Sequence, residues 1–555
     1  MKIDSAGWFV AADGVRFVPV GANYWPASCG VEMWQAWPEA EIIADLDLMA
    51  SLGFNTVRVF LRWPDFEPRA GEYDEVMFGR LERLTRLCLD RGIHPQPSLF
   101  VGWMSGGTFW PEWKGTRNVF ADAEVTRRGE AYAREAARRL APFAAELAGI
   151  DLGNELNALP ESREASPAAV RAWCARMTAA VRDVLPDVVM LSGCDHQQVT
   201  ADTGWRLGDQ PGIDVITMHG YPVPGWHPVP SGGLQDPLTR SLLPFYVKCA
   251  RAFGPVLLQE FGTILTRHAA YADGYLRAIL PACREAGANG FLWWCFRDIP
   301  ARVHPYMKGH FESDLGLVDE SGRVKDGLRY FVEFTREITR AAARPTETPP
   351  DAAVYWPAHY YHRDTQHNPG NSPHEVSRRM IAAHHLLEKT GRRVGIVRGD
   401  QPLSPDLRTI IIAGSFPSVP EMVALRVWVE NGGWLLWHGP DPVNWAEDLR
   451  QLLGAEIADY HAPAPLEATL AGLRYRFDSF PRGMRLEVTS LRAHVMLTDD
   501  AGRPFVLKNR LDKGSVTCVL ADVEGSVLGQ WLTAPSTPWV EWYRQLLLSE
   551  EPAVK

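Results

Sequence analysis

Two glutamates in this chain each follow a short apolar run. Glu155 ends the segment Asp151–Glu155, and Glu260 ends the segment Val256–Glu260 further along the chain. A single glutamate at a strand end is usually structural, but an Asn directly before Glu155 and a second segment of the same kind favour catalysis. Paired carboxyl groups cleave glycosidic bonds, because one protonates the departing oxygen while the other attacks or stabilises the anomeric carbon. The pair therefore predicts chemistry on a sugar.

The composition narrows the class of partner. The chain has 555 residues and a net charge of −10, without a block of like charges, which argues against a nucleic-acid partner. This length exceeds one hydrophobic core, so several domains are expected. Tryptophan is unusually frequent, with 21 copies against 15 tyrosines. Most single tryptophans are core residues, but indole faces also pack against sugar rings, so an oligosaccharide is the expected substrate.

The expected location is the cytoplasm. The first residues lack the basic start, apolar stretch and small-residue cleavage site of a secretion signal. No uninterrupted apolar run approaches the ~20 residues of a membrane span, so no membrane partner is expected. The eight cysteines form no CxxC pair and lie mostly in apolar patterns, which is typical of free thiols in a reducing compartment.

As far as about residue 340, strand-like runs alternate with amphipathic helical segments. Eight strands separated by helices predict a (β/α)8 TIM barrel, whose chemistry lies at the carboxyl ends of the strands. Glu155 and Glu260 follow the fourth and seventh strands. The strands are expected at Arg16–Ala22, Thr56–Phe60, His94–Phe100, Ile150–Gly153, Val188–Ser192, Val215–His219, Val256–Gln259 and Gly290–Trp294, and helices at Ala40–Leu52, Val76–Arg91, Val125–Leu147 and Pro167–Val184.

These residues resemble the retaining glycoside hydrolases of clan A, and within them family 5, over residues 16–335. In that clan an Asn-Glu pair ends strand four and a lone Glu ends strand seven. The resemblance implies that Glu155 is the acid/base and Glu260 the nucleophile. It also implies that Asn154 hydrogen-bonds the 2-hydroxyl of the sugar, a contact that strengthens in the transition state.

Further positions match the same family. Arg58 on strand two would hold the nucleophile ionised, and its alternative role is a structural ion pair. His219 and Tyr221 resemble the family's His-x-Tyr after strand six, in which the Tyr donates to the nucleophile. Trp294 matches the strand-eight Trp that forms the floor under the sugar at subsite −1. Trp293 is its alternative, because neighbouring strand residues point to opposite faces.

The segment after strand three favours β-mannosides. Phe100 stands where many family 5 cellulases carry a His. Mannan-acting members have Asn-Asn-Trp followed by Gly-Gly, and this chain has Trp103, Gly106 and Gly107 without the Asn. The segment from Arg58 to Tyr73 is also similar to mannanases.

The expected activity is that of an exo-acting retaining β-mannosidase that hydrolyses terminal residues of imported oligosaccharides. A Trp-rich segment holding Trp103, Trp110 and Trp113 could wall off the cleft, although plain packing is the alternative for each. Three other functions stay open: an endo-β-1,4-mannanase, a family 42-type β-galactosidase and an inactive carbohydrate-binding barrel. Retention of both glutamates argues against the inactive barrel, since binding alone does not require the pair.

A Pro/Thr-rich linker, Arg344–Pro350, separates the catalytic barrel at 1–343 from a second domain expected at 352–460. A helix opens at Ser372 with a capping box and stops near Gly391. The apolar runs Val394–Val397, Thr409–Ala413 and Trp434–Trp437 alternate with helices, which predicts a doubly wound α/β unit.

This second domain resembles the glutamine-amidotransferase-like domain of family 42 β-galactosidases and of some bacterial family 5 enzymes, where it mediates trimer formation. Amidotransferase chemistry would need a Cys, and none lies between Cys295 and Cys518. We therefore expect a non-catalytic domain that mediates a homo-oligomer, with a trimer implied by the resemblance.

From residue 461 to 555 the pattern changes to short alternating runs and a final helix near Trp539–Leu548, which predicts a small C-terminal β-sandwich. No phosphate-binding, serine-hydrolase or zinc-protease motif occurs in the chain, so no metal and no organic cofactor are expected. The runs are Leu473–Phe477, Met484–Val488, Ala493–Leu497, Pro504–Lys508 and Ser515–Ala521.

Overall fold

The computed structural model describes residues 1–548 except 12, 264, 265, 267, 304, 307–310, 341–348, 363–371 and 442–446. The chain divides into two compact units, Met1–Val223 with Gly233–Glu347, and Pro224–Gly232 with Thr348–Lys555. The predicted linker at 344–350 lies, as far as residue 348, outside the described residues. Within the described part, no helix is long and apolar enough to span a bilayer.

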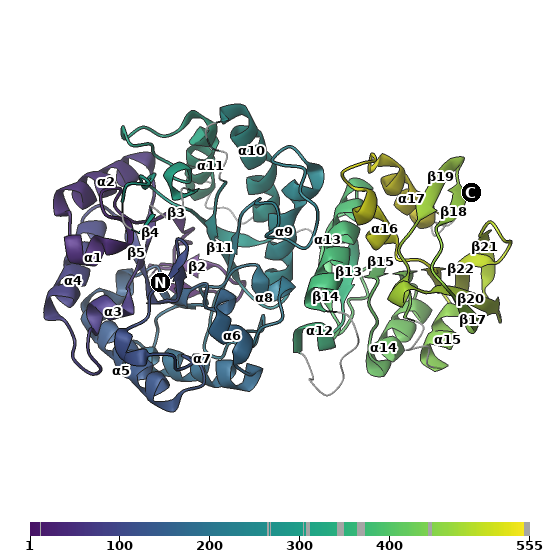
Figure 1. Ribbon diagram of the computed structural model, residues 1–555, viewed down its shortest axis with the longest axis horizontal. Helices are drawn as coiled ribbons and strands as arrows, with labels where there is room; N and C mark the ends of the chain where they lie inside the picture. The colour runs from purple at the N-terminus through teal and green to yellow at the C-terminus, as the bar shows by residue number, and fades with distance from the viewer. Residues whose placement is uncertain are drawn as a thin grey trace. The chain divides into compact units, whose positions relative to one another are not determined.

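The first unit is the predicted (β/α)8 barrel (Figure 1). Eight parallel strands pair in the order β10-β11-β12-β3-β4-β5-β8-β9, and an isolated parallel bridge between Leu191 and Val215 links the two ends of the sheet. All eight predicted strands are present, with ends that differ by a few residues. They are β3 (Val20–Asn23), β4 (Thr56–Phe60), β5 (His94–Val101), β8 (Ile150–Asn154), β9 (Met190–Leu191), β10 (Ile216–Gly220), β11 (Val256–Phe261) and β12 (Ala288–Trp293).

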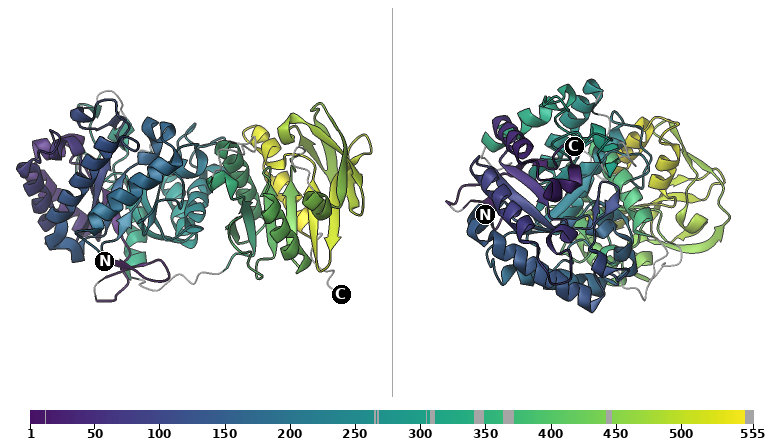
Figure 2. Two further views of the ribbon diagram at one scale, coloured as in Figure 1. Left: turned by 90° about the horizontal axis from the view of Figure 1, so that it is seen from below. Right: turned by 60° about the vertical axis from the view of Figure 1, so that its left-hand side comes forward.

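Helices surround these strands (Figure 2). Several begin at a side chain that accepts a backbone N–H of the first turn, as Asp74, Asp122 and Ser166 do, which satisfies donors that a helix start leaves unpaired. The helices are α1 (Met33–Ala36), α2 (Glu39–Leu52), α3 (Trp63–Phe66), α4 (Glu75–Leu89), α5 (Ala123–Leu140), α6 (Pro160–Glu164), α7 (Pro167–Arg182), α8 (Gln197–Thr200), α9 (Pro237–Arg251), α10 (Ala269–Glu285) and α11 (Arg329–Arg340).

The helix predicted at Val125–Leu147 is shorter than expected. α5 ends at Leu140, and the chain continues as a 3-10 helix, η3 (Ala141–Glu146), with Pro142 in its first turn. Proline lacks the N–H that an α-helix needs and clashes with the preceding turn, so the α-helix stops before it.

Barrel strands covered on both faces should be apolar throughout, and this barrel departs from that rule at several positions along its strands. Polar and charged side chains lie fully or almost fully buried on its strands, where they must find partners in one another. They are Asn23, Arg58, Gln96, Ser98, Asp151, Asn154, His219, Gln259 and Glu260.

The second unit contains a seven-stranded sheet in the order β14-β13-β15-β16-β23-β22-β21. Its first five strands are parallel and follow the 2-1-3-4-5 order of a doubly wound fold. Strand β13, second from one edge of this sheet, was not predicted from the sequence. The strands are β13 (Ala352–Trp356), β14 (Val394–Arg398), β15 (Thr409–Ala413), β16 (Trp434–His438), β21 (His494–Thr498), β22 (Pro504–Leu511) and β23 (Gly514–Val519).

Helices pack on this sheet (Figure 1). α13 lies on β13 and β15 beside α16 and α17, whereas α14 and α15 pack on β22 and β23. The predicted helix start at Ser372 is present, since its hydroxyl accepts the backbone N–H of Glu375. The helices are α12 (His359–His362), α13 (Pro373–Lys389), α14 (Val419–Glu430), α15 (Glu447–Leu453), α16 (Val523–Gln530) and α17 (Thr537–Leu548).

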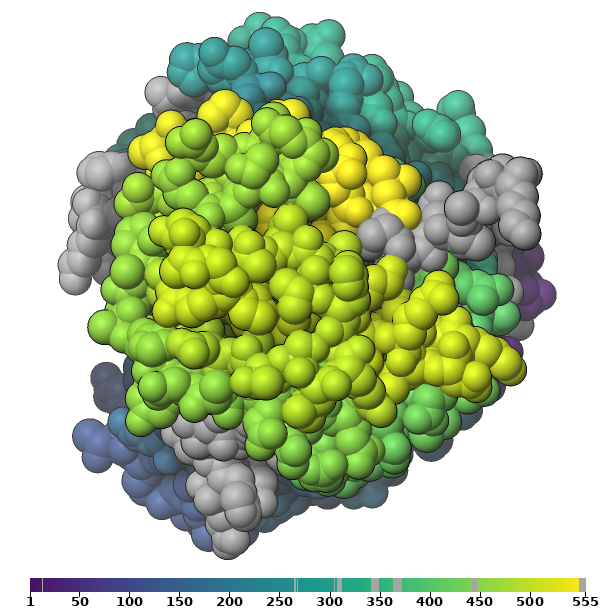
Figure 3. Space-filling view, turned by 90° about the vertical axis from the view of Figure 1, so that its right-hand side faces the viewer, coloured from purple at the N-terminus to yellow at the C-terminus, as the bar shows by residue number. Residues whose placement is uncertain are grey.

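The C-terminal strands are present but do not form the separate sandwich predicted for residues 461–555. β21, β22 and β23 extend the α/β sheet, because β23 pairs in parallel with β16. The remaining strands form two antiparallel pairs, β17 (Ala455–His461) with β20 (Arg485–Ser490) and β18 (Leu466–Leu470) with β19 (Leu473–Phe477). These late segments, in yellow-green, cover one face of the unit (Figure 3). Alternation in the sequence indicates a strand and its buried face but not its neighbour.

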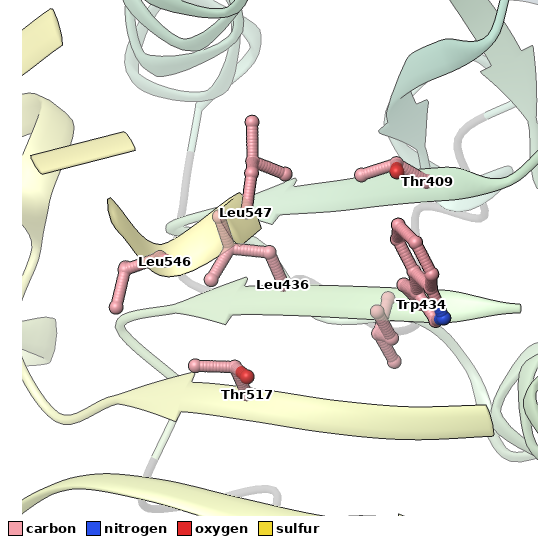
Figure 4. A pocket seen from close by; sticks show the side chains of 7 residues that line it. Thr409, Trp434, Leu436, Thr517, Leu546 and Leu547 are labelled. Atoms are coloured by element: carbon pink, nitrogen blue, oxygen red, sulfur yellow. The ribbon is translucent and has the colours of Figure 1, made fainter. Parts of the chain in front are cut away.

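A pocket in the second unit lies beneath α17, over strands β15, β16 and β23 (Figure 4). Its cavity volume is about 10 Å³, room for at most about one water molecule and far below the ~300 Å³ at which ligand sites usually begin. No titratable side chain lines it, so it carries no catalytic chemistry. Its lining residues are Thr409, Trp434, Leu435, Leu436, Thr517, Leu546 and Leu547.

Candidate active site

Closure of the barrel brings the two glutamates together at the carboxyl ends of β8 and β11. One carboxylate oxygen of Glu155, one of Glu260 and a ring nitrogen of His219 all lie within 4.8 Å of one another. Both glutamates are almost completely shielded, with side chains 14% and 6% exposed. A carboxyl separation of ~5 Å is typical of retaining glycosidases, whereas inverting enzymes leave room for a water.

Glu155 directly follows β8 in a left-handed backbone conformation, with φ 47° and ψ 39°. Such a conformation costs about 1–3 kcal/mol in a non-glycine residue and clusters at functional sites. The Glu155 N–H donates to the Gly193 carbonyl at 2.7 Å. Gly193 has no room for a side chain, because a Cβ there would lie 1.5 Å from the carbonyl oxygen of Gly153.

Burial, and to a smaller extent the charge of Asp195, raise the pKa of Glu155 to about 8 against the opposing effect of the Arg58 cation. The Asp195 carboxylate is held in place by the side-chain amide of Asn157, at 2.5 Å. Glu155 is therefore protonated at neutral pH.

Glu260 has partners that favour its ionised form. The Tyr221 hydroxyl donates to Oε1 at 2.6 Å, and Arg58 Nη1 donates to Oε2 at 3.1 Å. Burial, with the nearby charge of Glu155 as a smaller cause, raises the pKa of Glu260 to about 6. His219, Arg58 and Tyr221 act in the opposite direction. Of the two carboxyl groups, Glu260 is thus the one that ionises first.

Arg58 is completely buried and is held by a second carboxylate. Its Nε and Nη2 donate to Asp151 Oδ2 at 2.9 and 2.5 Å, and the Ser98 hydroxyl donates to the same oxygen at 2.8 Å. Arg58 therefore joins a buried ion pair with Asp151 and also contacts Glu260. That it keeps the nucleophile ionised stays a prediction. Asp151 was not predicted as a site residue, although a charged residue inside an apolar strand was a usable signal.

His219 stands between the two glutamates. Its Nδ1 lies 3.1 Å from Glu155 Oε1 and 3.6 Å from Glu260 Oε2. Its Nε2 lies 3.0 Å from Gln259 Oε1. Burial lowers the pKa of His219, which favours the neutral ring. Among the described residues, these three side chains form the one group close enough to hold a metal ion.

Trp294 follows β12 and is 3% exposed. Its Nε1 donates to Glu312 Oε2 at 3.1 Å, whereas Trp293 Nε1 donates to the Leu315 carbonyl at 2.9 Å and packs against Phe261. The two indoles thus have different surroundings. Burial raises the pKa of Glu312 to about 7, with the charge of Glu260 adding to it. This further buried carboxyl group was not predicted from the sequence, since it lies beyond the last strand.

Of the three loop tryptophans, Trp103 is hydrogen-bonded to Asn154 at the carboxyl end of β8. It lies in the hairpin of β6 (Trp103–Met104) and β7 (Gly107–Thr108), is 40% exposed, and its carbonyl accepts from Asn154 Nδ2 at 2.6 Å. Trp110 and Trp113 pack edge-on against Trp63, with ring centroids 6.3 and 5.2 Å away. Trp113 Nε1 also donates to a backbone carbonyl, that of Glu67, at 3.0 Å.

Comparison with known proteins identifies the family. No protein-family model matches the chain. The solved structure of the exo-beta-1,4-mannosidase Op5Man5 from Opitutaceae bacterium strain TAV5 is 62% identical in sequence, covers 98% of this chain and 99% of that one, and superposes with a TM-score of 0.95. The chain belongs to family 5 of the clan A glycoside hydrolases. It is a glycoside hydrolase whose catalytic unit is a TIM barrel.

A curated relative matches over a shorter stretch. Endoglycoceramidase I of Rhodococcus hoagii (strain 103S) is 31% identical over 116 residues, which is 20% of this chain and 21% of that protein. The chain therefore matches about a fifth of that relative's length.

More distant structures share the fold. A GH5_18 protein from Streptomyces cattleya, solved in complex with Manb1-4GlcNAc, is 23% identical over 71% of this chain and 99% of its own, with a TM-score of 0.62. The GH42 beta-galactosidase Gan42B from G. stearothermophilus is 15% identical over 97% of this chain and 89% of its own, with a TM-score of 0.72. The second likeness extends over both units.

Proposed function

We propose that this chain is a retaining exo-β-1,4-mannosidase that removes terminal mannosyl residues from oligosaccharides. The observation that carries the reaction type is the pair of buried carboxyl groups with oxygens within 4.8 Å. Support for the mannoside comes from the 62% identity, over nearly the full length of both chains, to the exo-beta-1,4-mannosidase Op5Man5.

In the first step Glu260 attacks the anomeric carbon and forms a covalent mannosyl-enzyme, while the bond from that carbon to the departing oxygen breaks. Glu155 gives its proton to the departing oxygen, which leaves as an alcohol. The environment suits these roles, because Glu155 is protonated near neutral pH and the cation of Arg58 helps to keep Glu260 ionised.

In the second step the roles of Glu155 reverse. Its carboxylate removes a proton from water, the resulting hydroxide attacks the anomeric carbon, and the bond to Glu260 breaks. Mannose is released with its original configuration, and both glutamates return to their starting states.

Neighbouring side chains would orient the sugar. Asn154 Nδ2 donates to the Trp103 carbonyl, so its buried Oδ1 is left to accept from the sugar's 2-hydroxyl. Trp294 would form the floor, with its ring fixed by the bond to Glu312. Trp103, Trp110 and Trp113 remain proposed as the wall that limits the cleft to a chain end.

Digestion of mannohexaose tests the proposal. Exo action should release mannose from the first time point, with mannopentaose as the co-product. Early mannobiose and mannotriose would instead indicate an endo-mannanase, and turnover of aryl β-galactoside in preference to β-mannoside would indicate the family 42-type activity. If the unaltered protein binds mannohexaose but forms no more product than a Glu260→Gln control, the chain is an inactive carbohydrate-binding barrel.

We also propose that the second unit assembles copies of the chain and takes no part in catalysis. Its one cysteine, Cys518, is buried within strand β23 and does not stand on the strand-to-helix elbow that amidotransferase chemistry needs. Helix α14 presents three exposed valines at helical spacing, Val419, Val423 and Val427. Light scattering should show an oligomer that Val423→Glu weakens, whereas Val76→Glu, at an exposed valine of the barrel, should not. A monomeric full-length chain would contradict this role.

A cytoplasmic location is proposed on the state of the thiols. All eight cysteines are unpaired and buried, as expected for a protein that never passes through an oxidising compartment. Cell fractionation with a compartment marker tests it, and recovery of the activity from the medium or periplasm would contradict it.

A further inference from the structure

A chain of buried amides leads from a backbone carbonyl to His219. Gln96 Nε2 donates to the carbonyl of Ala148 at 3.3 Å, and a carbonyl can only accept. Gln96 Oε1 is therefore free to accept from Gln259 Nε2, at 2.7 Å. This leaves Gln259 Oε1, which can only accept, facing His219 Nε2 at 3.0 Å. Gln96 and Gln259 are fully buried and His219 is 1% exposed, so water does not compete for these bonds.

The direction of every bond in this chain determines which ring nitrogen carries the proton. His219 must donate from Nε2, so in the neutral ring Nδ1 holds a lone pair. That lone pair faces Glu155 Oε1 at 3.1 Å. A hydrogen bond at this distance needs a proton on the glutamate.

We propose that Gln96 and Gln259 are positioning residues, which fix His219 as its Nε2–H tautomer so that Nδ1 accepts the proton of Glu155 and holds that glutamate in its acid form. The role assigned to Glu155 rests on the proposed function, whereas the tautomer rests on the hydrogen bonds alone. Neither glutamine touches the reacting atoms.

The hydrogen bonds from the Ala148 carbonyl through Gln96 and Gln259 to His219, called the relay below, would assist both steps of the reaction. A hydrogen bond made only to the protonated carboxyl group favours that form and prepares Glu155 to act as the acid. After the proton has gone to the departing oxygen, the Nδ1 lone pair faces a carboxylate, which favours removal of a proton from water.

Charged groups around His219 belong to several elements. Glu260 Oε2 approaches Nδ1 from β11 at 3.6 Å, and its charge favours a protonated ring. Arg58 on β4 opposes that charge, and Asp195 acts with Glu260. The carboxylate of Asp151 on β8 interacts with His219 as well and is itself paired with Arg58. The hydrogen bond to Gln259 also raises the pKa of His219, but burial is the largest cause and keeps the pKa below its ordinary value.

Two variants of Gln259 test the relay. Gln259→Leu removes the acceptor at Nε2 and frees the tautomer, while Gln259→Glu keeps the shape and adds a charge that favours a doubly protonated ring. In both, the basic limb of the pH profile of kcat/KM on mannobiose should move to lower pH, with about a tenfold loss near pH 8. A dinitrophenyl β-mannoside, whose leaving group needs no proton, should lose much less.

The matched control is Gln198→Leu. Gln198 is a buried glutamine of α8 that donates to the Thr217 carbonyl at 3.0 Å, outside the relay. Its loss should lower stability without moving the pH profile. If the Gln259 variants instead lose activity equally on mannobiose and on the dinitrophenyl β-mannoside, with an unchanged pH profile of kcat/KM, the glutamine serves only packing and the proposal is wrong.

Nitrogen-15 NMR of histidine-labelled protein reads the tautomer without any substrate, with His219→Gln used to assign the signal. The resting protein should show an unprotonated Nδ1 and a protonated Nε2, and Gln259→Leu should mix the two tautomers. A protonated Nδ1 in the unaltered protein would refute the relay. This readout stands even if the chain does not hydrolyse mannosides, so the two proposals fail separately.

Discussion

Each unit of the molecule buries a polar cluster at the carboxyl end of parallel strands, and the two clusters differ in their balance of charge. In the barrel, Glu155 and Glu260 lie within 4.8 Å of each other around one histidine. In the second unit, His438 at the end of β16 meets Glu524 of α16 at 2.7 Å, and the Tyr543 hydroxyl donates to the same carboxylate oxygen.

The second cluster pairs unlike groups. His438, Glu524 and Tyr543 are fully buried, and Asp522 beside them is paired with Arg379 at 2.9 Å. Such a cluster joins a strand to two helices and leaves no carboxyl pair in conflict. In the barrel two acids cannot both ionise cheaply, so one keeps its proton. Burial alone therefore does not indicate catalysis, whereas like charges buried together do.

The sharpest test of this contrast is to neutralise one glutamate in the barrel. Glu260→Gln removes the nucleophile and should lower kcat on aryl β-mannosides by roughly 10⁴-fold or more. Thermal stability should change little, because Arg58 stays paired with Asp151. Steady-state kinetics and calorimetry on the same preparation measure both. Activity within tenfold of the unaltered enzyme would remove Glu260 from the mechanism.

Glu155→Ala should separate substrates by their leaving groups. Hydrolysis of mannobiose should fall by about 10²–10⁴-fold, because the departing sugar needs a proton, while a dinitrophenyl mannoside should still form the mannosyl-enzyme. Azide should restore turnover and give a β-mannosyl azide, which NMR identifies. An inverted azide would exchange the roles of Glu155 and Glu260.

The pH profile reports the charge conflict itself. Activity on mannobiose requires Glu260 ionised and Glu155 protonated, so kcat/KM should rise as the pH passes about 6 and fall as it passes about 8. Each further pH unit above the basic limb should cost about tenfold. The free energy of unfolding should also fall as the pH rises. The pKa of Glu155 is raised in the folded state, so its contribution to stability is full below the ordinary pKa of 4.5 and is lost as the pH rises through about 8.

A rate profile without a basic limb would show that Glu155 is not the titrating acid. Glu155→Gln provides the stability control, since it should remove that part of the pH dependence from thermal unfolding curves.

The smallest effect on activity is expected in the second unit. Glu524→Gln should leave kcat unchanged per folded molecule but destabilise the unit by about 1–3 kcal/mol, because His438 and Tyr543 lose their charged partner. Differential scanning calorimetry measures the change. A fall in kcat larger than the loss of folded protein would show that this cluster takes part in catalysis. The proposed difference between the two clusters would then be wrong.

Local pattern was enough to predict the barrel and the two glutamates. Strands such as Thr56–Phe60 show in the sequence as short runs of apolar and β-branched residues, and strand β4 has those bounds. Glu155 and Glu260 could be picked out because each ends a short apolar run, whereas Arg58, His219 and Tyr221 were expected only from the resemblance to family 5. Barrel closure then requires their strand ends to meet.

Other features depended on partners distant in sequence. Strand β23 looked like part of a separate sandwich because alternation does not reveal which sheet edge a strand joins. Glu312 lies beyond the last barrel strand, and only the folded chain brings it to Trp294.

The sequence by itself determined which chemistry the site can perform, since the types of the catalytic side chains and their offsets from the strands are local properties. Only the tertiary structure decided their protonation. Asp151 reaches Arg58 across 93 residues of sequence, and Gln96 reaches Gln259 across 163. A buried carboxyl or imidazole takes its charge state from the dielectric surroundings, the neighbouring charges and the hydrogen-bond direction, and all three exist only once the strands have closed around it.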